Sequence, residues 1–272
     1  MREFRGRVAV ITGAGSGIGR ALALDLARRG AQLALSDVDD YGLAETVRQA
    51  ERIGARAKGY HLDVADRAAV LAHADEVVGD FGRAELVVNN AGVTATSSFT
   101  ETDIADFDWV MNIDFGGVLN GTKAFLPHLI ASGDGYLVNI SSLFGLMTVP
   151  RQTAYHAAKY AVRGFTESLR QELRIDGHPV GVSCVHPGGI KTNIVNNARH
   201  STPEYGKSLS TAFDRIAGTS APAAARTIIR GIQRDQARIL IGPDAHALNV
   251  LQALLGSRFA WFTEKISRRA MY

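Results

Sequence analysis

The chain has 272 residues, of which 46% are hydrophobic and only 7 are proline, so it is long and apolar enough to bury a good-sized core. An α/β chain of this length commonly forms one domain, and we expect a single domain over residues 1–272. The formal net charge of +3 is small. The basic residues show neither the aromatic interleaving nor the zinc-ligand spacing of nucleic-acid-binding modules, so we predict no nucleic-acid partner and no metal site.

Cysteine content and the first residues bear on the cellular compartment. Cys184 is the only cysteine, and it lies in the apolar run from Val180 to Val185, where we expect it to pack as a small hydrophobic side chain. The first residues lack the apolar stretch of a secretory signal, and no uncharged apolar run is long enough to span a bilayer. We therefore expect a cytoplasmic protein.

The first part of the chain has the pattern strand, glycine turn, helix. Val8 to Thr12 is a short apolar run, and residues 20–30 carry apolar side chains at helical spacing before a glycine. Between them lies a Gly-x-x-x-Gly-x-Gly turn. Glycines let the backbone approach a pyrophosphate, and the N-terminus of the helix then binds it. The residues of the turn that we expect to contact a dinucleotide are Gly13, Ser16, Gly17, Ile18 and Gly19.

The second predicted strand, Gln32 to Ser36, ends at Asp37, eighteen residues beyond Gly19. A carboxylate at this place can accept hydrogen bonds from both ribose hydroxyls of an adenosine, and it would repel a 2′-phosphate. The position of Asp37 therefore favours NAD over NADP. The alternative is an acidic residue of a solvated turn.

Strands and helices continue to alternate. We predict helices over 44–54, 68–81, 103–132 and 152–176, and strands over 56–61, 85–88, 136–140 and 180–186. This order predicts a Rossmann-type, doubly wound sheet of about seven parallel strands with helices on both faces. Ligands of such sheets bind at the carboxyl ends of the strands.

Several residues follow predicted strands and are candidates for that edge of the sheet. Asp63 and Val64 follow the third strand, and the Asp63 carboxylate could accept a hydrogen bond from the adenine amino group. The segment Asn90, Ala91 and Gly92 follows the fourth strand and is small or polar, as suits a chain passing beside a cofactor. His186, with apolar neighbours and a proline next to it, is expected to pack at a strand end.

Tyr155 and Lys159 are four residues apart in the predicted helix over 152–176, so they should lie on one face of it. A nearby ammonium favours the phenolate form of a tyrosine. Ser142, just beyond the strand over 136–140, could donate to a substrate oxygen that Tyr155 also contacts. Taken alone, Tyr-x-x-x-Lys is an ordinary surface pair of a helix.

The combination of motifs is more specific. Residues 7 to about 242 resemble the short-chain dehydrogenase/reductase family in the order and spacing of the glycine turn after Thr12, Asn89-Asn90-Ala91-Gly92, Ser142, Tyr155-x-x-x-Lys159 and Pro187-Gly188. The resemblance implies that Tyr155 is the acid/base, that Lys159 lowers its pKa and holds the nicotinamide ribose, and that Ser142 orients the substrate. It also implies cofactor contacts from residues 90–92, Pro187 and Gly188, and that Ile190 and Thr192 hold the carboxamide.

One position departs from the pattern of that family. The family usually has an asparagine in the long helix, three residues before a glycine, which holds a water that relays protons to the lysine. Counting back from Gly117 places Asp114 there, whereas Asn112 should face away because two helical positions turn a side chain by about 200°. A carboxylate can accept from a water but cannot donate as an amide does. The alternative is a helix acid without a role.

Two segments should influence substrate choice. Residues 193–220 are polar and irregular, and we expect a mobile loop with one short helix that covers the site as a lid. Between Ser142 and Tyr155 the chain is unusually apolar for the mouth of a site (Leu143, Phe144, Leu146, Met147 and Val149). This favours a hydrophobic alcohol or ketone, unless these side chains only pack on the lid.

The chain is expected to end with a helix over 221–235, a strand over 238–241 and an amphipathic extension over 243–272. Leucine, phenylalanine and isoleucine recur there at three- and four-residue steps from Leu248 to Ile266, beside basic side chains. Core packing or a subunit contact explains such a stripe. Contact with an anionic membrane surface is the alternative.

The sequence thus predicts an NAD(H)-dependent oxidoreductase that interconverts a hydrophobic secondary alcohol and its ketone, with Tyr155 as acid/base. One alternative is a non-catalytic nucleotide-binding sensor or scaffold. Others are a dehydratase, an epimerase or a double-bond reductase of the same family. The resemblance also suggests a homodimer or homotetramer.

Overall fold

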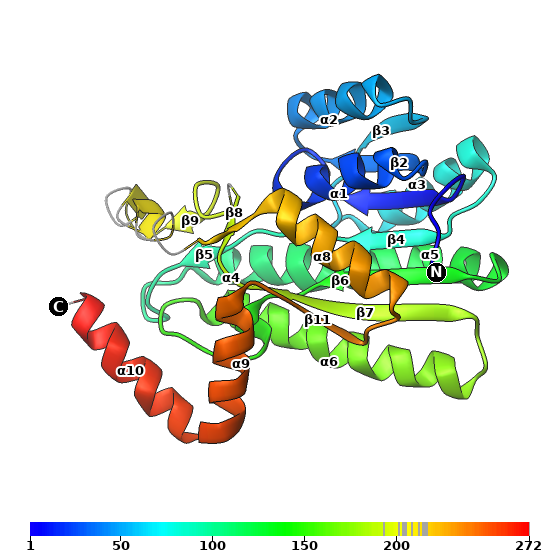
Figure 1. Cartoon of the computed structure of the whole chain (residues 1–272). Helices are drawn as coiled ribbons and strands as arrows, with labels where there is room; N and C mark the ends of the chain where they lie inside the picture. Colours follow the sequence, from blue (N-terminus) through cyan, green and yellow to red (C-terminus); the bar gives the residue numbers. More distant parts are fainter. Residues whose placement is uncertain are drawn as a thin grey trace.

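A computed structural model describes residues 1–192, 194–200, 202, 206–207, 209–211, 213 and 217–271. Its centre is a seven-stranded sheet in the order β11-β7-β6-β4-β1-β2-β3, and every pairing is parallel (Figure 1). The strands are β1 (Val8–Thr12), β2 (Gln32–Asp37), β3 (Ala57–His61), β4 (Leu86–Asn89), β6 (Gly135–Ile140), β7 (Val180–Pro187) and β11 (Arg238–Ile241). The predicted doubly wound sheet is confirmed.

Helices cover both faces of this sheet. One face carries α1 (Gly17–Arg28), α2 (Asp40–Arg52) and α8 (Ala221–Gln233), and the other carries α3 (Arg67–Phe81), α5 (Gly117–Ala131) and α6 (Thr153–Ile175). Successive residues of β1 join opposite cores: Ala9 and Ile11 pack with the first helix layer, and Val8 and Val10 with the second. The central strands β1, β4, β6 and β7 are buried on both faces and are therefore largely apolar runs, which is why the sequence predicts them well, whereas the edge strand β3 is mostly accessible.

The strand order reverses at β1, which pairs with β2 on one side and β4 on the other. At such a point the connections leave in opposite directions, and ligands of open α/β sheets bind there, beyond the carboxyl ends of the strands. The residues that follow β1, β4, β6 and β7 therefore meet there.

The predicted continuous helix over 103–132 contains an irregularity. It begins as α4 (Ile104–Met111), passes through a π-helical turn, η1 (Asn112–Gly116), and continues as α5. A π turn holds one extra residue per turn, and such turns often lie at functional sites. Asp114 lies in this turn.

Part of the predicted lid, 193–220, lies outside the described residues. The described part is joined to the body by two short parallel pairs: β8 (Ile190–Lys191) with β10 (Thr219–Ser220), and β5 (Ala95–Thr96) with β9 (Arg199–His200). The lid itself stays a prediction.

The C-terminal stripe is divided between two helices, α9 (Pro243–Leu255) and α10 (Arg258–Met271), because the chain turns at Gly256, which has a φ of +54°. Leu248, Leu251 and Leu255 of α9 pack against a buried cluster. Figure 1 shows α10, in red, extending away from the sheet. Within the described residues, no helix has the length and apolar character needed to cross a bilayer.

This packing changes the interpretation of the apolar run after Ser142, which begins with a short 3-10 helix, η2 (Leu143–Gly145). Leu143, Leu146 and Met147 are buried in one cluster with α9 and Phe259 instead of lining the mouth of the site. The alternative of simple packing holds for these three residues, with α9 as the packing partner.

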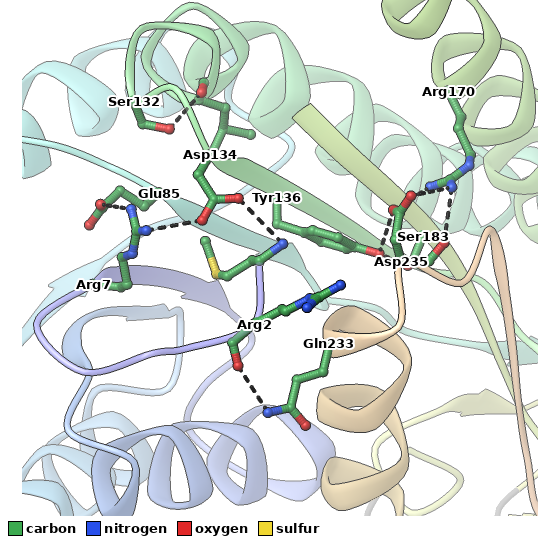
Figure 2. A network of polar contacts seen from close by, with 12 residues as sticks. Arg2, Arg7, Glu85, Ser132, Asp134, Tyr136, Arg170, Ser183, Gln233 and Asp235 are labelled. Carbon is green, nitrogen blue, oxygen red and sulfur yellow. Dashed lines mark hydrogen bonds and ion pairs between the residues drawn. The ribbon is translucent and has the colours of Figure 1, made fainter. Parts of the chain in front are cut away.

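Polar contacts hold the opposite, amino-terminal edge of the sheet (Figure 2). Arg170 of α6 donates to both carboxylate oxygens of Asp235, at 2.9 and 2.8 Å, and to the Val182 carbonyl at 2.5 Å. Arg7 forms an ion pair of 2.6 Å with Glu85. These contacts join α6, β1, β4, β7 and β11 at the edge remote from the carboxyl ends of the strands.

Candidate active site

The glycine turn has backbone angles that favour glycine, with a φ of +64° at Gly13 and +53° at Gly17. A Cβ at Gly13 would lie 2.8 Å from the Ala91 Cα, so the chain after β4 passes directly against the turn. Ser16 is the N-cap of α1 but makes no side-chain capping bond. The first N–H groups of α1 therefore have no side-chain cap and can bind an anion.

Thr12 holds the glycine turn and the segment after β4 together. Its Oγ1 accepts from the backbone N–H groups of Asn90 (3.0 Å) and Ala91 (3.1 Å), and the Asn90 side chain donates to the carbonyls of Thr12 (2.9 Å) and Gly13 (3.1 Å). This role of Thr12 was not predicted, because it depends on a contact between distant segments.

Asp37, at the end of β2, lies beside the turn. Its carboxylate accepts from Gly15 N at 2.7 Å and from Asp39 N at 3.0 Å, one bond to each oxygen. Each oxygen keeps a further lone pair for a ribose hydroxyl. Arg20, which the sequence analysis did not single out, donates to the carbonyls of Gly15 and Gly42 and so fixes this part of the turn.

The residues expected at the adenine differ in accessibility. Asp63 is exposed, and one of its carboxylate oxygens accepts from Ala65 N at 2.9 Å. Val64 is buried, and its carbonyl accepts from the Asn120 side chain at 3.0 Å. The Asp63 carboxylate thus remains accessible to a ligand.

Tyr155 and Lys159 lie together near the carboxyl end of β6, as their spacing on α6 predicts. Both are buried, with exposed fractions of 8% and 3%, and the Lys159 Nζ lies 5.4 Å from the centroid of the Tyr155 ring. Ser142 follows β6 and caps η2 by accepting from Phe144 N at 3.1 Å. Its hydroxyl is close enough to Tyr155 to lower the pKa of that phenol. The three predicted residues are therefore adjacent.

His186 is packed at the end of β7, as expected. It is fully buried, and its Nδ1 lies 2.8 Å from the Ser142 carbonyl, to which the protonated tautomer at this nitrogen donates. Burial lowers the pKa of His186 to about 4. At neutral pH this side chain is a neutral support for the Ser142 backbone.

Asp114 contacts Lys159 directly. It has no exposed surface, its Oδ2 lies 2.9 Å from the Lys159 Nζ, and its Oδ1 accepts from Val93 N at 2.7 Å. Lys159 also donates to the Ile140 carbonyl at 3.2 Å. Asn112 is exposed and faces away from the site, as predicted.

The electrostatics of the three buried groups are coupled. Burial raises the pKa of the Tyr155 phenol, the Lys159 charge opposes that shift, and the Asp114 carboxylate adds to it. Burial lowers the pKa of Lys159, but the Asp114 carboxylate, together with Tyr155 and Cys184, raises it, and the net direction is upward. Lys159 alone therefore does not bring the phenol below its usual pKa.

The segment after β7 approaches the glycine turn from the other side. A Cβ at Gly17 would lie 3.2 Å from the Thr192 methyl group, so Thr192 lies against the turn. Ile190 is buried in β8. Gly189 N donates to the Asp244 carboxylate of α9 at 2.6 Å, and a Cβ at Gly188 would lie 2.2 Å from the same carboxylate. The sequence analysis did not identify Asp244 as a residue near the site. The only sequence feature that pointed to it is its position directly after Gly-Pro, at the start of a helix.

Comparison with known proteins agrees with this geometry. A family model described as short chain dehydrogenase matches residues 7–203. The chain belongs to the short-chain dehydrogenase/reductase family. It is therefore an oxidoreductase of a family that uses a nicotinamide cofactor, and the open N-terminus of α1 and the accessible oxygens of Asp37 fit such a dinucleotide.

Individual members of the family are similar over most of their length. A Mycobacterium tuberculosis protein named "Putative oxidoreductase SadH" is 55% identical over 260 residues, covering 95% of this chain and 94% of its own. A Thermotoga maritima 3-oxoacyl-[acyl-carrier-protein] reductase is 36% identical over 79% of this chain and 84% of its own. A Burkholderia phymatum short-chain dehydrogenase/reductase, solved with NAD, has a TM-score of 0.89 and 34% identity, covering 96% and 97% of the two chains.

Proposed function

We propose that this chain is an NAD(H)-dependent oxidoreductase that interconverts a hydrophobic secondary alcohol and its ketone. The observation that supports it most is the meeting of Ser142, Tyr155 and Lys159 at the edge of the sheet where the N-terminus of α1 has no side-chain cap. A phenol and a serine hydroxyl that lie next to each other can hold one substrate oxygen between them. A protein that only binds the nucleotide has no need of that phenol.

In the direction of reduction, the Tyr155 O–H donates its proton to the carbonyl oxygen of the substrate, and the carbonyl carbon gains a hydride. In the direction of oxidation, the phenolate takes the proton of the substrate hydroxyl. The nicotinamide, when bound, supplies or accepts the hydride. Ser142 orients the substrate oxygen, and Lys159 holds the ribose and favours the phenolate.

The preference for NAD rests on Asp37. Similar solved structures include complexes with NAD and with NADP, so family membership does not decide the cofactor. The Asp37 carboxylate, fixed by Gly15 N, has lone pairs for two ribose hydroxyls and would repel a 2′-phosphate. The other proposed cofactor contacts are the turn residues, Asp63 and Val64, residues 90–92, and Pro187, Gly188, Ile190 and Thr192.

The substrate is proposed to be apolar because of the side chains around Tyr155. Phe144 meets the Tyr155 ring edge to face, with 6.2 Å between the centroids, and partly buried Val93 and Ile194 join the same cluster. Such a lining favours a hydrocarbon substituent on the substrate. The Thermotoga relative, by its name, reduces a 3-oxoacyl group, which is a ketone. Substrate choice is further proposed to depend on the lid over 193–220.

A screen of apolar secondary alcohols and ketones with NAD and NADP in parallel tests this proposal. We expect turnover of at least one pair, with kcat/KM higher for NAD. A clear preference for NADP would contradict the role of Asp37. Absence of any rate above that of a Tyr155→Phe variant would favour the non-catalytic alternative.

We further propose a cytoplasmic homodimer or homotetramer. Size-exclusion chromatography with light scattering would test the oligomeric state.

A further inference from the structure

The pair of Asp114 and Lys159 is the most unusual group of charges in the site, because both side chains are almost completely enclosed. Their exposed fractions are 0% and 3%. The Asp114 carboxylate faces two donors, the Val93 N–H and the Lys159 ammonium. The helix position of Asp114 is set by the π turn η1, so this contact is built into the backbone.

The pair carries no net charge. Proton transfer from ammonium to carboxylate would leave two neutral groups, and without transfer the opposite charges lie 2.9 Å apart. In either form, the Tyr155 phenol has beside it a neutral pair instead of an unopposed ammonium. Ionisation of Tyr155 would then place a net charge of −1 in a buried site, which is unfavourable.

Resting on the proposed function, we infer that Asp114 is a positioning residue that acts through Lys159 to keep Tyr155 a protonated phenol until a further positive charge, that of the oxidised nicotinamide, enters the site. A protonated phenol is the form that donates to a ketone oxygen. The carboxylate thus favours ketone reduction near neutral pH. Alcohol oxidation then requires a more alkaline pH.

Other titratable groups near Tyr155 do not offer the same effect. His186 of β7 hydrogen-bonds to the Ser142 backbone, and its pKa lies at about 4. Burial raises the pKa of Cys184, also of β7, to about 12. His156 of α6 faces the carbonyls of Phe144 and Val149, and burial lowers its pKa.

The remaining elements around the site supply no competing charge. Gly92 and Val93, which follow β4, carry no titratable side chain, and Ser142 supplies a hydroxyl. Asp244 of α9 is held by Gly189 N. Within the described residues, the coupled titratable groups at this site are therefore Tyr155 and its Asp114–Lys159 pair.

The first test measures ionisation of Tyr155 without turnover. The tyrosinate absorbance near 295 nm would be titrated in the cofactor-free protein, with the Tyr155→Phe curve subtracted to isolate this residue. We expect an Asp114→Asn variant to titrate at least about one pH unit lower than the wild type, because an uncharged amide leaves the Lys159 charge unopposed. An unchanged midpoint in a folded variant would overturn the inference.

A matched control removes a buried acid at the far edge of the sheet. Glu85 is 2% exposed and pairs with Arg7, so Glu85→Gln costs stability in a comparable way but should leave the Tyr155 titration in place. An equal shift in Glu85→Gln would show that loss of stability, not charge beside Lys159, moves the titration. That result would also overturn the inference.

The wild-type protein provides a test that needs no variant of Asp114. Adding NAD, but not NADH, should lower the tyrosinate midpoint, because only the oxidised ring is positive. A wild-type midpoint already well below pH 10 without cofactor would contradict the inference even if Asp114→Asn did not fold.

The pH dependence of turnover is a separate test of the inference. In Asp114→Asn, the rise of alcohol oxidation with pH should begin about one pH unit lower, and ketone reduction should decline at a correspondingly lower pH. An unchanged pH profile would count against the inference. If no alcohol or ketone is turned over, the proposed function fails, whereas the absorbance titration still decides the role of Asp114.

Discussion

At the scale of single residues, the site depends on a lysine whose surroundings are unusual. Lys159 is enclosed by the Asp114 carboxylate at 2.9 Å and the Ile140 carbonyl at 3.2 Å. A buried ion pair of this kind adds little stability over a well-packed apolar pair, but breaking it leaves one buried charge without a partner. The role that we propose for the pair is therefore its effect on a neighbouring group, Tyr155.

Lys159→Ala should therefore destabilise the protein strongly. We expect a loss of about 3–5 kcal/mol in the free energy of unfolding, because Asp114 remains buried and unpaired. An Asp114→Leu/Lys159→Met double variant should recover most of that loss. Urea unfolding at pH 8 measures both, and a cost below about 1 kcal/mol for Lys159→Ala would contradict the enclosed pair.

The sequence predicted these residues, but it did not predict all the contacts between them. The proximity of Tyr155 and Lys159 follows from helical spacing alone, because both lie on α6. The contact of Asp114 with Lys159 joins two helices 45 positions apart in the chain, and its position in a π turn has no clear sequence signal. Counting along the helix found the residue, but not the direct ion pair.

A second residue makes stability depend on pH. His73 of α3 is 4% exposed between the rings of Tyr60 and Phe125, and its Nε2 has no hydrogen-bond partner among the described residues. Burial lowers the pKa of His73 from 6.5 to about 4. The folded state therefore disfavours the protonated ring.

Proton uptake by His73 makes the folded protein less stable as the pH falls. Below pH 6.5 the unfolded chain binds a proton at His73 that the folded protein binds only near pH 4, so stability is full above pH 6.5 and falls as the pH drops to 4. Each pH unit costs about 1.4 kcal/mol from this group. His73→Leu should lose less stability over that range in urea unfolding, whereas a variant of the exposed His246 should behave like the wild type. A His73→Leu curve parallel to that of the wild type would be evidence against this.

At the scale of elements, α9 links the C-terminal region to the proposed cofactor site. Its Asp244 accepts from Gly189 N at 2.6 Å and lies against Gly188, and its leucines cover the chain after Ser142. The helix thus supports two segments that line the proposed site. Sequence periodicity predicted the apolar stripe of α9 but not its partner, since helical spacing does not say which surface a stripe covers.

Asp244→Ala should weaken cofactor binding more than chemistry. Loss of a hydrogen bond to a charged acceptor costs about 1.5 kcal/mol, so we expect the KM for NAD to rise about tenfold with kcat changed less than about threefold. Steady-state kinetics with varied NAD would measure both. Asp134→Ala, at the opposite edge of the sheet, is the control, and equal effects of the two substitutions would remove the role given to α9.

At the scale of the whole molecule, the two ends of the parallel sheet have different tasks. Every candidate site residue lies near the carboxyl ends of the strands, in loops or the helices that follow them. The amino ends are joined by the contacts of Arg170, Asp235, Arg7 and Glu85 (Figure 2). The central strands are buried on both faces, so their apolar runs could be recognised in the sequence. These polar contacts join residues far apart in the chain and were not predicted.

This division predicts a substitution that affects stability alone. Arg170→Ala removes the hydrogen bonds of the guanidinium to the Val182 carbonyl and to both carboxylate oxygens of Asp235, which keeps the Tyr136 hydroxyl as a donor at 3.3 Å. We expect a loss of about 2–3 kcal/mol in the free energy of unfolding. The KM for NAD at 25 °C should not change. Arg174→Ala, whose side chain is 67% exposed and 3.7 Å from Asp235, should cost less than about 0.5 kcal/mol. Similar losses in both variants would contradict a specific role for Arg170.

The most direct test of the account replaces Tyr155 with phenylalanine and measures turnover and NAD affinity on the same preparation. We predict that kcat falls at least about a hundredfold, because the proton carrier is gone, while the Kd for NAD by calorimetry stays within about threefold. Turnover close to that of the wild type would contradict the assignment of Tyr155 as acid/base.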